Sequence, residues 1–102
     1  MKRVICLGKY ETVFPLKAIG MEYRVCNTGE EAREALKSLI SQNYGLIFIE
    51  EDYFQSVKDI VDSLKEQAYP AVTFIPGAGG STGQAREKLR AILLRAIGID
   101  IF

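Results

Sequence analysis

Short apolar runs alternate with longer amphipathic segments four times along this chain of 102 residues, and this alternation constrains its fold more than any other feature. Runs of four or five mostly apolar residues, ended by turn residues, are typical of β-strands. They predict strands over four ranges: 3–7, 22–26, 46–49 and 71–75. Strands that alternate with helices are typical of a parallel sheet with helices on both faces.

We therefore predict one α/β domain with a small, doubly wound, four-stranded parallel sheet. Right-handed crossovers and a single reversal of the winding direction give the flavodoxin-like strand order 2-1-3-4. The run LIFI at 46–49 is apolar throughout. This is expected of a central strand that is covered on both faces.

Helix signals fill the gaps between the predicted strands. The clearest helix starts at Thr28, which forms a capping box with Glu31. Apolar residues then follow at helical spacing: Ala32, Ala35, Leu36, Leu39 and Ile40. We also expect Thr12 to cap a short helix that Gly20 closes, and a further helix from about residue 52 to 67.

The chain divides at the end of the fourth strand. Residues 1–76 form the predicted α/β core, and residues 77–102 form a glycine-rich loop and a C-terminal amphipathic helix, within the same domain or as a mobile appendage. Seven residues of this helix are the candidate partner-binding surface: Arg86, Leu89, Arg90, Ile92, Leu93, Arg95 and Ile97. The same apolar stripe could instead cover the sheet, since helical stripes commonly face a core, and both interpretations stay open.

The loop GAGGSTG at 77–83 has the composition of a phosphate-binding loop but lacks the residues that bind phosphate. A P-loop needs a lysine followed by Ser or Thr, and this loop has no lysine. The dinucleotide fingerprint GxGxxG would need glycine at position 82, where Thr82 stands. We therefore predict a connecting loop and no bound nucleotide or other cofactor.

Catalytic and metal-binding residue types are scarce. The chain has no histidine, the commonest general base and transition-metal ligand, and only two cysteines, Cys6 and Cys26. Two alternatives remain open. Cys6, followed by Thr12, resembles the sugar-phosphotransferase B domains, in which a cysteine after the first strand takes phosphate, but here Cys6 lies inside the first apolar run. Glu50, Glu51 and Asp52 after the third strand suggest a receiver-like or magnesium site, or only the acidic start of the next helix, which the helix dipole favours.

Charge and hydropathy exclude several classes of partner. The 13 basic and 13 acidic residues cancel, which gives no electrostatic reason to expect nucleic acid. No apolar run approaches the roughly 20 residues of a membrane span, and the N-terminal residues do not have the pattern of a signal peptide. We therefore expect a cytoplasmic protein that does not insert into a membrane.

Four segments together resemble the F subunits of V-type and A-type rotary ATPases. After the first strand come Gly8, the pair Thr12-Val13 and the triplet Ala18-Ile19-Gly20. The other three segments are GLIFIE at 45–50, PAVTFIPG at 70–77 and RAIGIDI at 95–101. They occur in the family's order and at its spacing. Lys9 stands where the family often has an acid.

The resemblance implies a non-catalytic subunit of the central stalk that binds the coiled-coil D subunit. It also implies a position near the catalytic A and B subunits, peripheral to a membrane complex. Such a protein couples ATP turnover to ion transport and carries no cofactor, metal or catalytic residue. Its C-terminal region is the part that the resemblance associates with regulation.

Overall fold

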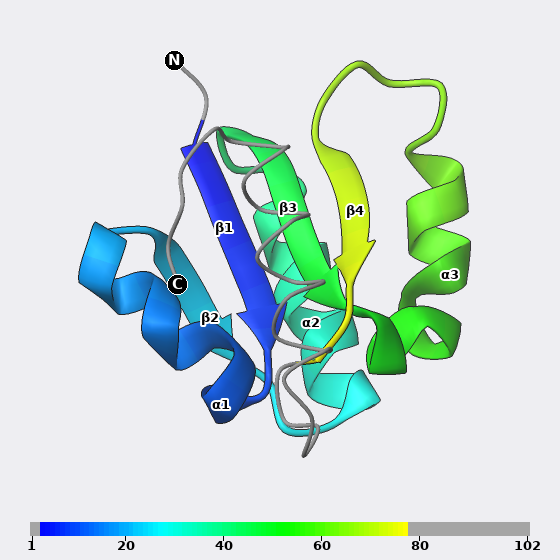
Figure 1. Ribbon diagram of the computed structural model, residues 1–102. Helices are drawn as coiled ribbons and strands as arrows, with labels where there is room; N and C mark the ends of the chain where they lie inside the picture. Colours follow the sequence, from blue (N-terminus) through cyan, green and yellow to red (C-terminus); the bar gives the residue numbers. More distant parts are fainter. Residues whose placement is uncertain (1–2, 78–102) are drawn as a thin grey trace.

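The computed structural model describes residues 3–77 and shows a four-stranded, entirely parallel sheet. In sequence order the strands are β1 (Arg3–Gly8), β2 (Glu22–Val25), β3 (Tyr44–Glu50) and β4 (Ala71–Ile75). In the sheet they lie in the order β2-β1-β3-β4 (Figure 1). The predicted fold class and strand order are confirmed. The predicted division at residue 76 stays a prediction.

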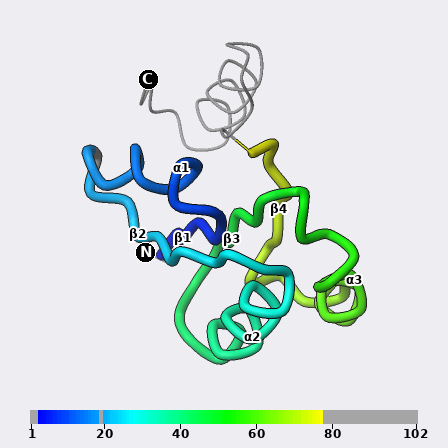
Figure 2. Tube along the Cα trace, turned by 90° about the horizontal axis from the view of Figure 1, so that it is seen from below, coloured from blue at the N-terminus to red at the C-terminus, as the bar shows by residue number. Residues whose placement is uncertain are grey.

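Helices lie on both faces of the sheet. Helix α1 (Tyr10–Val13) continues into the 3-10 helix η1 (Phe14–Ile19) and lies on one face. Helices α2 (Gly29–Leu39) and α3 (Phe54–Ser63) lie on the other, and the short 3-10 helix η2 (Glu51–Tyr53) precedes α3. Figure 2 shows α1 on one side of the strands and α2 with α3 on the opposite side.

Side chains alternate along the strands and therefore supply two apolar layers. The layer under α2 and α3 includes Ile5, Leu7, Ile47 and Ile49. The opposite layer, toward α1, consists of Cys6, Val13, Leu16, Phe48 and Ile75. Because β3 contributes to both layers, its run of apolar residues is explained by burial on both faces.

Helix α2 begins as the sequence predicts. The Thr28 hydroxyl accepts a hydrogen bond from the backbone N–H of Glu31 at 3.1 Å. The Glu31 carboxylate in turn accepts one from the backbone N–H of Asn27, also at 3.1 Å. The return bond thus reaches one residue further back than in the standard capping box.

The predicted start of the first helix is wrong. Thr12 does not cap it but lies inside it, buried, and Lys9 is the N-cap residue. The Lys9 carbonyl accepts hydrogen bonds from the backbone N–H groups of Thr12 and Val13, so the helical turn has already formed before Thr12. The predicted end is confirmed: Gly20 has a φ of 75°, in the left-handed region that glycine adopts at low cost.

The predicted helix at 52–67 is shorter than expected. Its α-helical part ends at Ser63, because Leu64 and Gln67 donate their backbone N–H groups to carbonyls three residues back. Such bonds are typical of a tightened turn after a helix end. Within residues 3–77, no helix is long and apolar enough to cross a membrane. The predicted C-terminal helix and its seven candidate contact residues lie outside the described residues.

Candidate functional site

The carboxyl ends of β1 and β3 form the place where a fold of this kind usually binds a ligand. These two strands are neighbours, and the chain leaves them toward opposite faces of the sheet: to α1 after β1 and to α3 after β3. In doubly wound sheets this switch point opens a crevice at the strand ends. Gly8 ends β1 and Glu50 ends β3, so these residues border the crevice.

The carboxylate of Glu50 lies at this switch point and is 1% exposed. One oxygen, Oε1, accepts a hydrogen bond from the backbone N–H of Lys9 at 2.9 Å. The other, Oε2, accepts one from the Lys9 ammonium at 2.7 Å. The ammonium also donates to the exposed carboxylate of Asp52 at 2.8 Å. A buried charge is tolerated when it is paired and hydrogen-bonded in this way.

Two glycines leave the space that the Glu50 carboxylate fills. A Cβ atom added at Gly8 would lie 2.8 Å from Glu50 Oε1, and one added at Gly77 would lie 2.9 Å from Oε2. Real side chains essentially never show such short contacts. Because Gly8 ends β1, Glu50 ends β3 and Gly77 follows β4, the ends of three strands meet around one carboxylate.

Tyr53 extends the cluster to the end of β2. Its ring lies under the Lys9 ammonium, 5.0 Å from the ring centroid, in the range of a cation–π contact. Its hydroxyl donates a 2.6 Å hydrogen bond to the carbonyl of Cys26, just after β2. Hydrogen bonds to Asp52 and then to Glu50 raise the pKa of Lys9, which is therefore charged at neutral pH. We call Lys9, Glu50, Asp52 and Tyr53 the Lys9–Glu50 cluster.

This cluster pairs the acid at the switch point within the protein. Both carboxylate oxygens of Glu50 accept hydrogen bonds from Lys9. Among residues 3–77 no group of three or more acidic, Cys or His side chains could hold a metal ion. Of the acids predicted as a magnesium or receiver-like site, Glu50 is buried and Asp52 is exposed, and both pair with the Lys9 ammonium. Glu51 is exposed at the start of η2.

Cys6 lacks the properties of a phosphocysteine. Its side chain is fully buried in the apolar layer toward α1. Burial, and next the nearby charge of Glu50, raise the pKa of its thiol to about 12. Since the thiolate is the nucleophile, such a thiol is inert at neutral pH. The geometry therefore argues against the phosphotransfer alternative.

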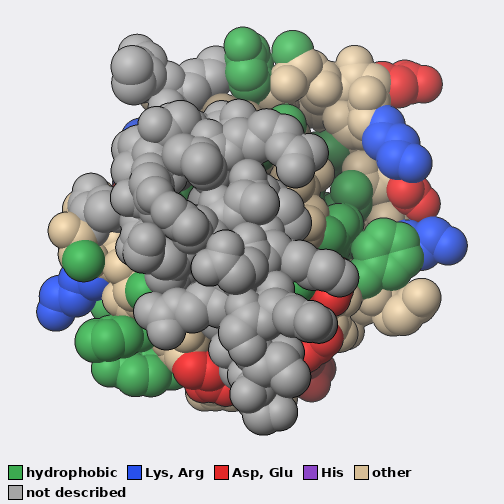
Figure 3. All heavy atoms as spheres, in the orientation of Figure 1, with side chains coloured by type: hydrophobic (Ala, Val, Ile, Leu, Met, Phe, Trp, Pro, Cys, Tyr) green, Lys and Arg blue, Asp and Glu red, His purple; other side chains and the backbone are tan. Residues whose placement is uncertain are grey.

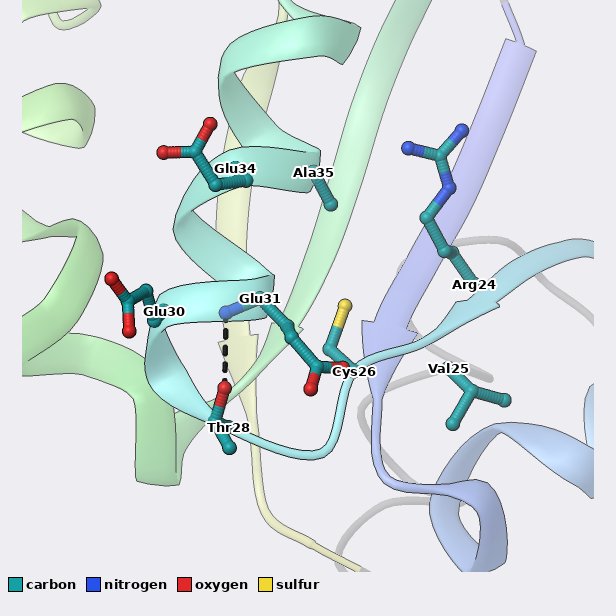
Figure 4. A pocket seen from close by; sticks show the side chains of 8 residues that line it. All are labelled: Arg24, Val25, Cys26, Thr28, Glu30, Glu31, Glu34 and Ala35. Carbon is teal, nitrogen blue, oxygen red and sulfur yellow. Dashed lines mark hydrogen bonds between the residues drawn. The ribbon is translucent and has the colours of Figure 1, made fainter.

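Apart from the crevice at the strand ends, a pocket lies between β2 and α2 (Figure 4). Its volume is about 880 Å³, and Cys26 forms part of its wall. Figure 4 shows the carboxylates of Glu30 and Glu34 pointing away from Cys26, so the acidic groups do not converge on one point. Burial is the main cause that raises the pKa of the Cys26 thiol. The pocket thus lacks the convergent polar groups of a small-molecule site.

The sequence reasoning missed the pairing of Lys9 with Glu50. The two residues are 41 positions apart, and the pairing depends on β1 and β3 being neighbours. A signal was nevertheless present, because the predicted order 2-1-3-4 places the end of the first strand beside the end of the third. Lys9 after the first strand and Glu50 after the third are then close enough to be expected to form an ion pair.

Comparisons with known proteins agree on one family. The sequence model described as "ATP synthase (F/14-kDa) subunit" matches residues 4–93. The chain is similar to the F subunit of the V-type ATP synthase of Clostridium perfringens, with 25% identity over 100 residues that cover 98% of this chain and 95% of that protein. It is also similar to the corresponding V-type F subunit of Fusobacterium nucleatum, with 25% identity over 101 residues, 99% of this chain and 96% of that protein.

An archaeal protein is similar as well. The F subunit of the A-type ATP synthase of Methanothermobacter thermautotrophicus is 24% identical over 100 residues, which cover 96% of this chain and 94% of that protein. Each of these alignments covers nearly the whole length of this chain and of the similar protein.

Proposed function

The chain belongs to the family of the ATP synthase (F/14-kDa) subunit, and on this basis we propose that it is a non-catalytic subunit of the central stalk of a V-type or A-type rotary ATPase. Relatives named as the F subunits of V-type and A-type ATP synthases match it almost from end to end. This full-length similarity is the observation that carries the proposal.

The ion pair at the switch point supports a role without chemistry of its own. At the place where doubly wound folds bind ligands, both carboxylate oxygens of Glu50 already accept hydrogen bonds from Lys9. Cys6, the nucleophile of the phosphotransfer alternative, is buried and protonated at neutral pH. A domain with these features is suited to binding other proteins.

The proposed partners are the coiled-coil D subunit of the stalk and, around it, the catalytic A and B subunits. The proposed contact residues on the C-terminal helix are the seven named above, from Arg86 to Ile97. In this arrangement the chain is on the cytoplasmic side, peripheral to the membrane part of the complex. It helps to couple ATP turnover to ion transport.

Co-purification tests this proposal directly. The full chain, tagged and co-expressed with the D subunit of the same organism, is expected to elute with it as one complex in size-exclusion chromatography. Calorimetry of the isolated chain with Mg-ATP is expected to show no binding at micromolar concentrations. Failure to associate with the D subunit, or micromolar affinity for Mg-ATP, would contradict the stalk assignment.

A further inference from the structure

Strand β2 forms one edge of the sheet, at the end opposite to β4 (Figure 1). Among the described residues its only neighbour is β1, with which it pairs from Glu22 to Val25. No backbone hydrogen bond within residues 3–77 joins the outer side of β2 to another segment. An edge of this kind presents unpaired N–H and C=O groups. A further strand can therefore add to the sheet beside β2.

The backbone groups of β2 that point away from β1 belong to alternate residues. The N–H of Cys26, the residue after the strand, donates a 2.8 Å hydrogen bond to the carbonyl of Gly8 on β1. Successive residues of a strand direct their N–H and C=O groups alternately to one side and to the other. The groups of Arg24 therefore also point toward β1, and those of Tyr23 and Val25 point outward.

Two opposite charges lie on one face of β2. Glu22 and Arg24 are two residues apart, and their partners on β1 belong to the apolar layer under α2 and α3. Arg24 is exposed, and its one hydrogen bond, to the Ser38 hydroxyl, is 3.3 Å long. Glu22 is half-buried and accepts hydrogen bonds from Arg3 and Tyr44. The guanidinium of Arg24 has five donors and can bind a further carboxylate.

The backbone and the charges of β2 are both matched by β2 of a second copy. A two-fold axis perpendicular to the sheet pairs the two edges in antiparallel directions. With the axis beside Tyr23, the outward N–H and C=O of this residue bond to those of Tyr23 in the second copy. Glu22 then faces Arg24 of that copy at a non-hydrogen-bonded position, where opposed side chains lie closest. An axis beside Glu22 or Arg24 would place like charges opposite each other, which is destabilising.

We propose that the free chain forms a symmetric homodimer by antiparallel pairing of β2 with β2 of a second copy, which joins the two sheets into one. This inference does not rest on the proposed function. Two Glu22–Arg24 pairs on one face and the Tyr23 pair on the other set the register, since opposite charges and aromatic pairs stabilise neighbouring strands. Because β2 has only four residues, the contact is small and the dimer is weak. We expect a Kd between about 10 μM and 1 mM.

Sedimentation equilibrium of the full chain measures this Kd directly. Arg24→Glu places a carboxylate opposite Glu22 in both halves of the pairing and should raise the Kd at least about 10-fold. The matched control, Lys58→Glu, makes the same charge change at an exposed position of α3 and should stay within about twofold of the unmodified chain. Figure 3 shows acidic and basic side chains along the right-hand edge, where Figure 1 places α3, across the molecule from β2. Circular dichroism melting verifies that each variant is folded.

A disulfide trap tests the register. Chains with Glu22→Cys and chains with Arg24→Cys are oxidised mildly, separately and as a mixture; the native thiols of Cys6 and Cys26 are buried. In the proposed register the new thiols of unlike chains are directly opposite, with Cα atoms about 4.5 Å apart, within the range of a disulfide. Those of like chains are about 7 to 8 Å apart, beyond that range.

We therefore expect a covalent dimer from the mixture and little from either variant alone. A chain that stays monomeric at 1 mM, the upper limit of about 1 mM set for the Kd, would overturn the inference. So would an Arg24→Glu variant that dimerises like the control, or cross-linking of either variant alone as readily as of the mixture. The proposed function stands in each of these cases, because its test is association with the D subunit.

Discussion

At the scale of single residues, Glu50 is the most informative position in the molecule. Its carboxylate is almost completely buried, and burial without partners would cost several kcal/mol. Lys9 offsets this cost with a backbone and an ammonium hydrogen bond. The sequence identified Glu50 as an acid after a strand but assigned it to a helix start. Its burial could not be predicted, because it requires the glycines at 8 and 77 to be brought together by the fold.

The Lys9–Glu50 pair predicts an asymmetry between two single variants. Lys9→Met leaves a buried carboxylate without its ammonium and should reduce the free energy of unfolding by about 3 kcal/mol. Glu50→Gln should cost only about 1 kcal/mol, because the Lys9 ammonium keeps Asp52 as a partner and is partly exposed. Urea unfolding followed by far-UV circular dichroism measures both. The double variant should be more stable than Lys9→Met alone. Equal losses in the two single variants would show that the pair is not buried as described.

At the scale of elements, α2 and α3 are joined by a pair of contacts that local sequence patterns do not predict. The Arg33 guanidinium donates to both carboxylate oxygens of Asp59, at 2.7 and 2.9 Å, and to the carbonyl of Ser56. Near the start of α2, a Cβ at Gly29 would lie 2.8 Å from the Ser56 Cβ. The sequence predicted the capping and the apolar spacing of α2, because both depend on residues close together in the chain. It did not predict the contact between α2 and α3, because that contact depends on how each helix packs on the sheet.

The Arg33–Asp59 pair makes stability depend on pH in acid. The hydrogen bonds from Arg33 are the main cause that lowers the pKa of Asp59 from 3.8 to about 2. A lowered carboxyl pKa stabilises the fold above the unfolded-state value, and this contribution is lost as the pH falls through the folded-state value. We expect the stability difference between the unmodified chain and Asp59→Asn to narrow between about pH 4 and pH 2. Arg33→Lys, which keeps the charge but loses the two-pronged geometry, should lie between them. A constant difference over this range, measured by urea unfolding, would contradict the pairing.

At the scale of the whole molecule, the sheet order followed from the sequence because few topologies satisfy right-handed crossovers with a single reversal. The structure also shows that the described helices cover the two faces of the sheet unevenly. One face lies under α2 and α3. On the other, α1 and η1 contact β1 and β2. The seven candidate contact residues of the C-terminal helix lie outside the described residues, so their role stays a prediction.

Deletion of residues 84–102 separates the two interpretations of that helix. Its stripe includes Leu89, Ile92 and Leu93, and burial of three such side chains is worth roughly 5 to 8 kcal/mol before entropy costs. If the stripe binds the D subunit, as we propose, the truncated chain should stay folded by far-UV circular dichroism, because the layer under α2 and α3 is retained. Its affinity for that partner should then fall at least about 100-fold, since a loss of this size in contact energy far exceeds 1.4 kcal/mol per tenfold. Deletion of residues 99–102 alone, which leaves the stripe intact, is the matched control and should bind normally. Aggregation or melting of the longer truncation at room temperature would instead show that the stripe covers the sheet beside α1.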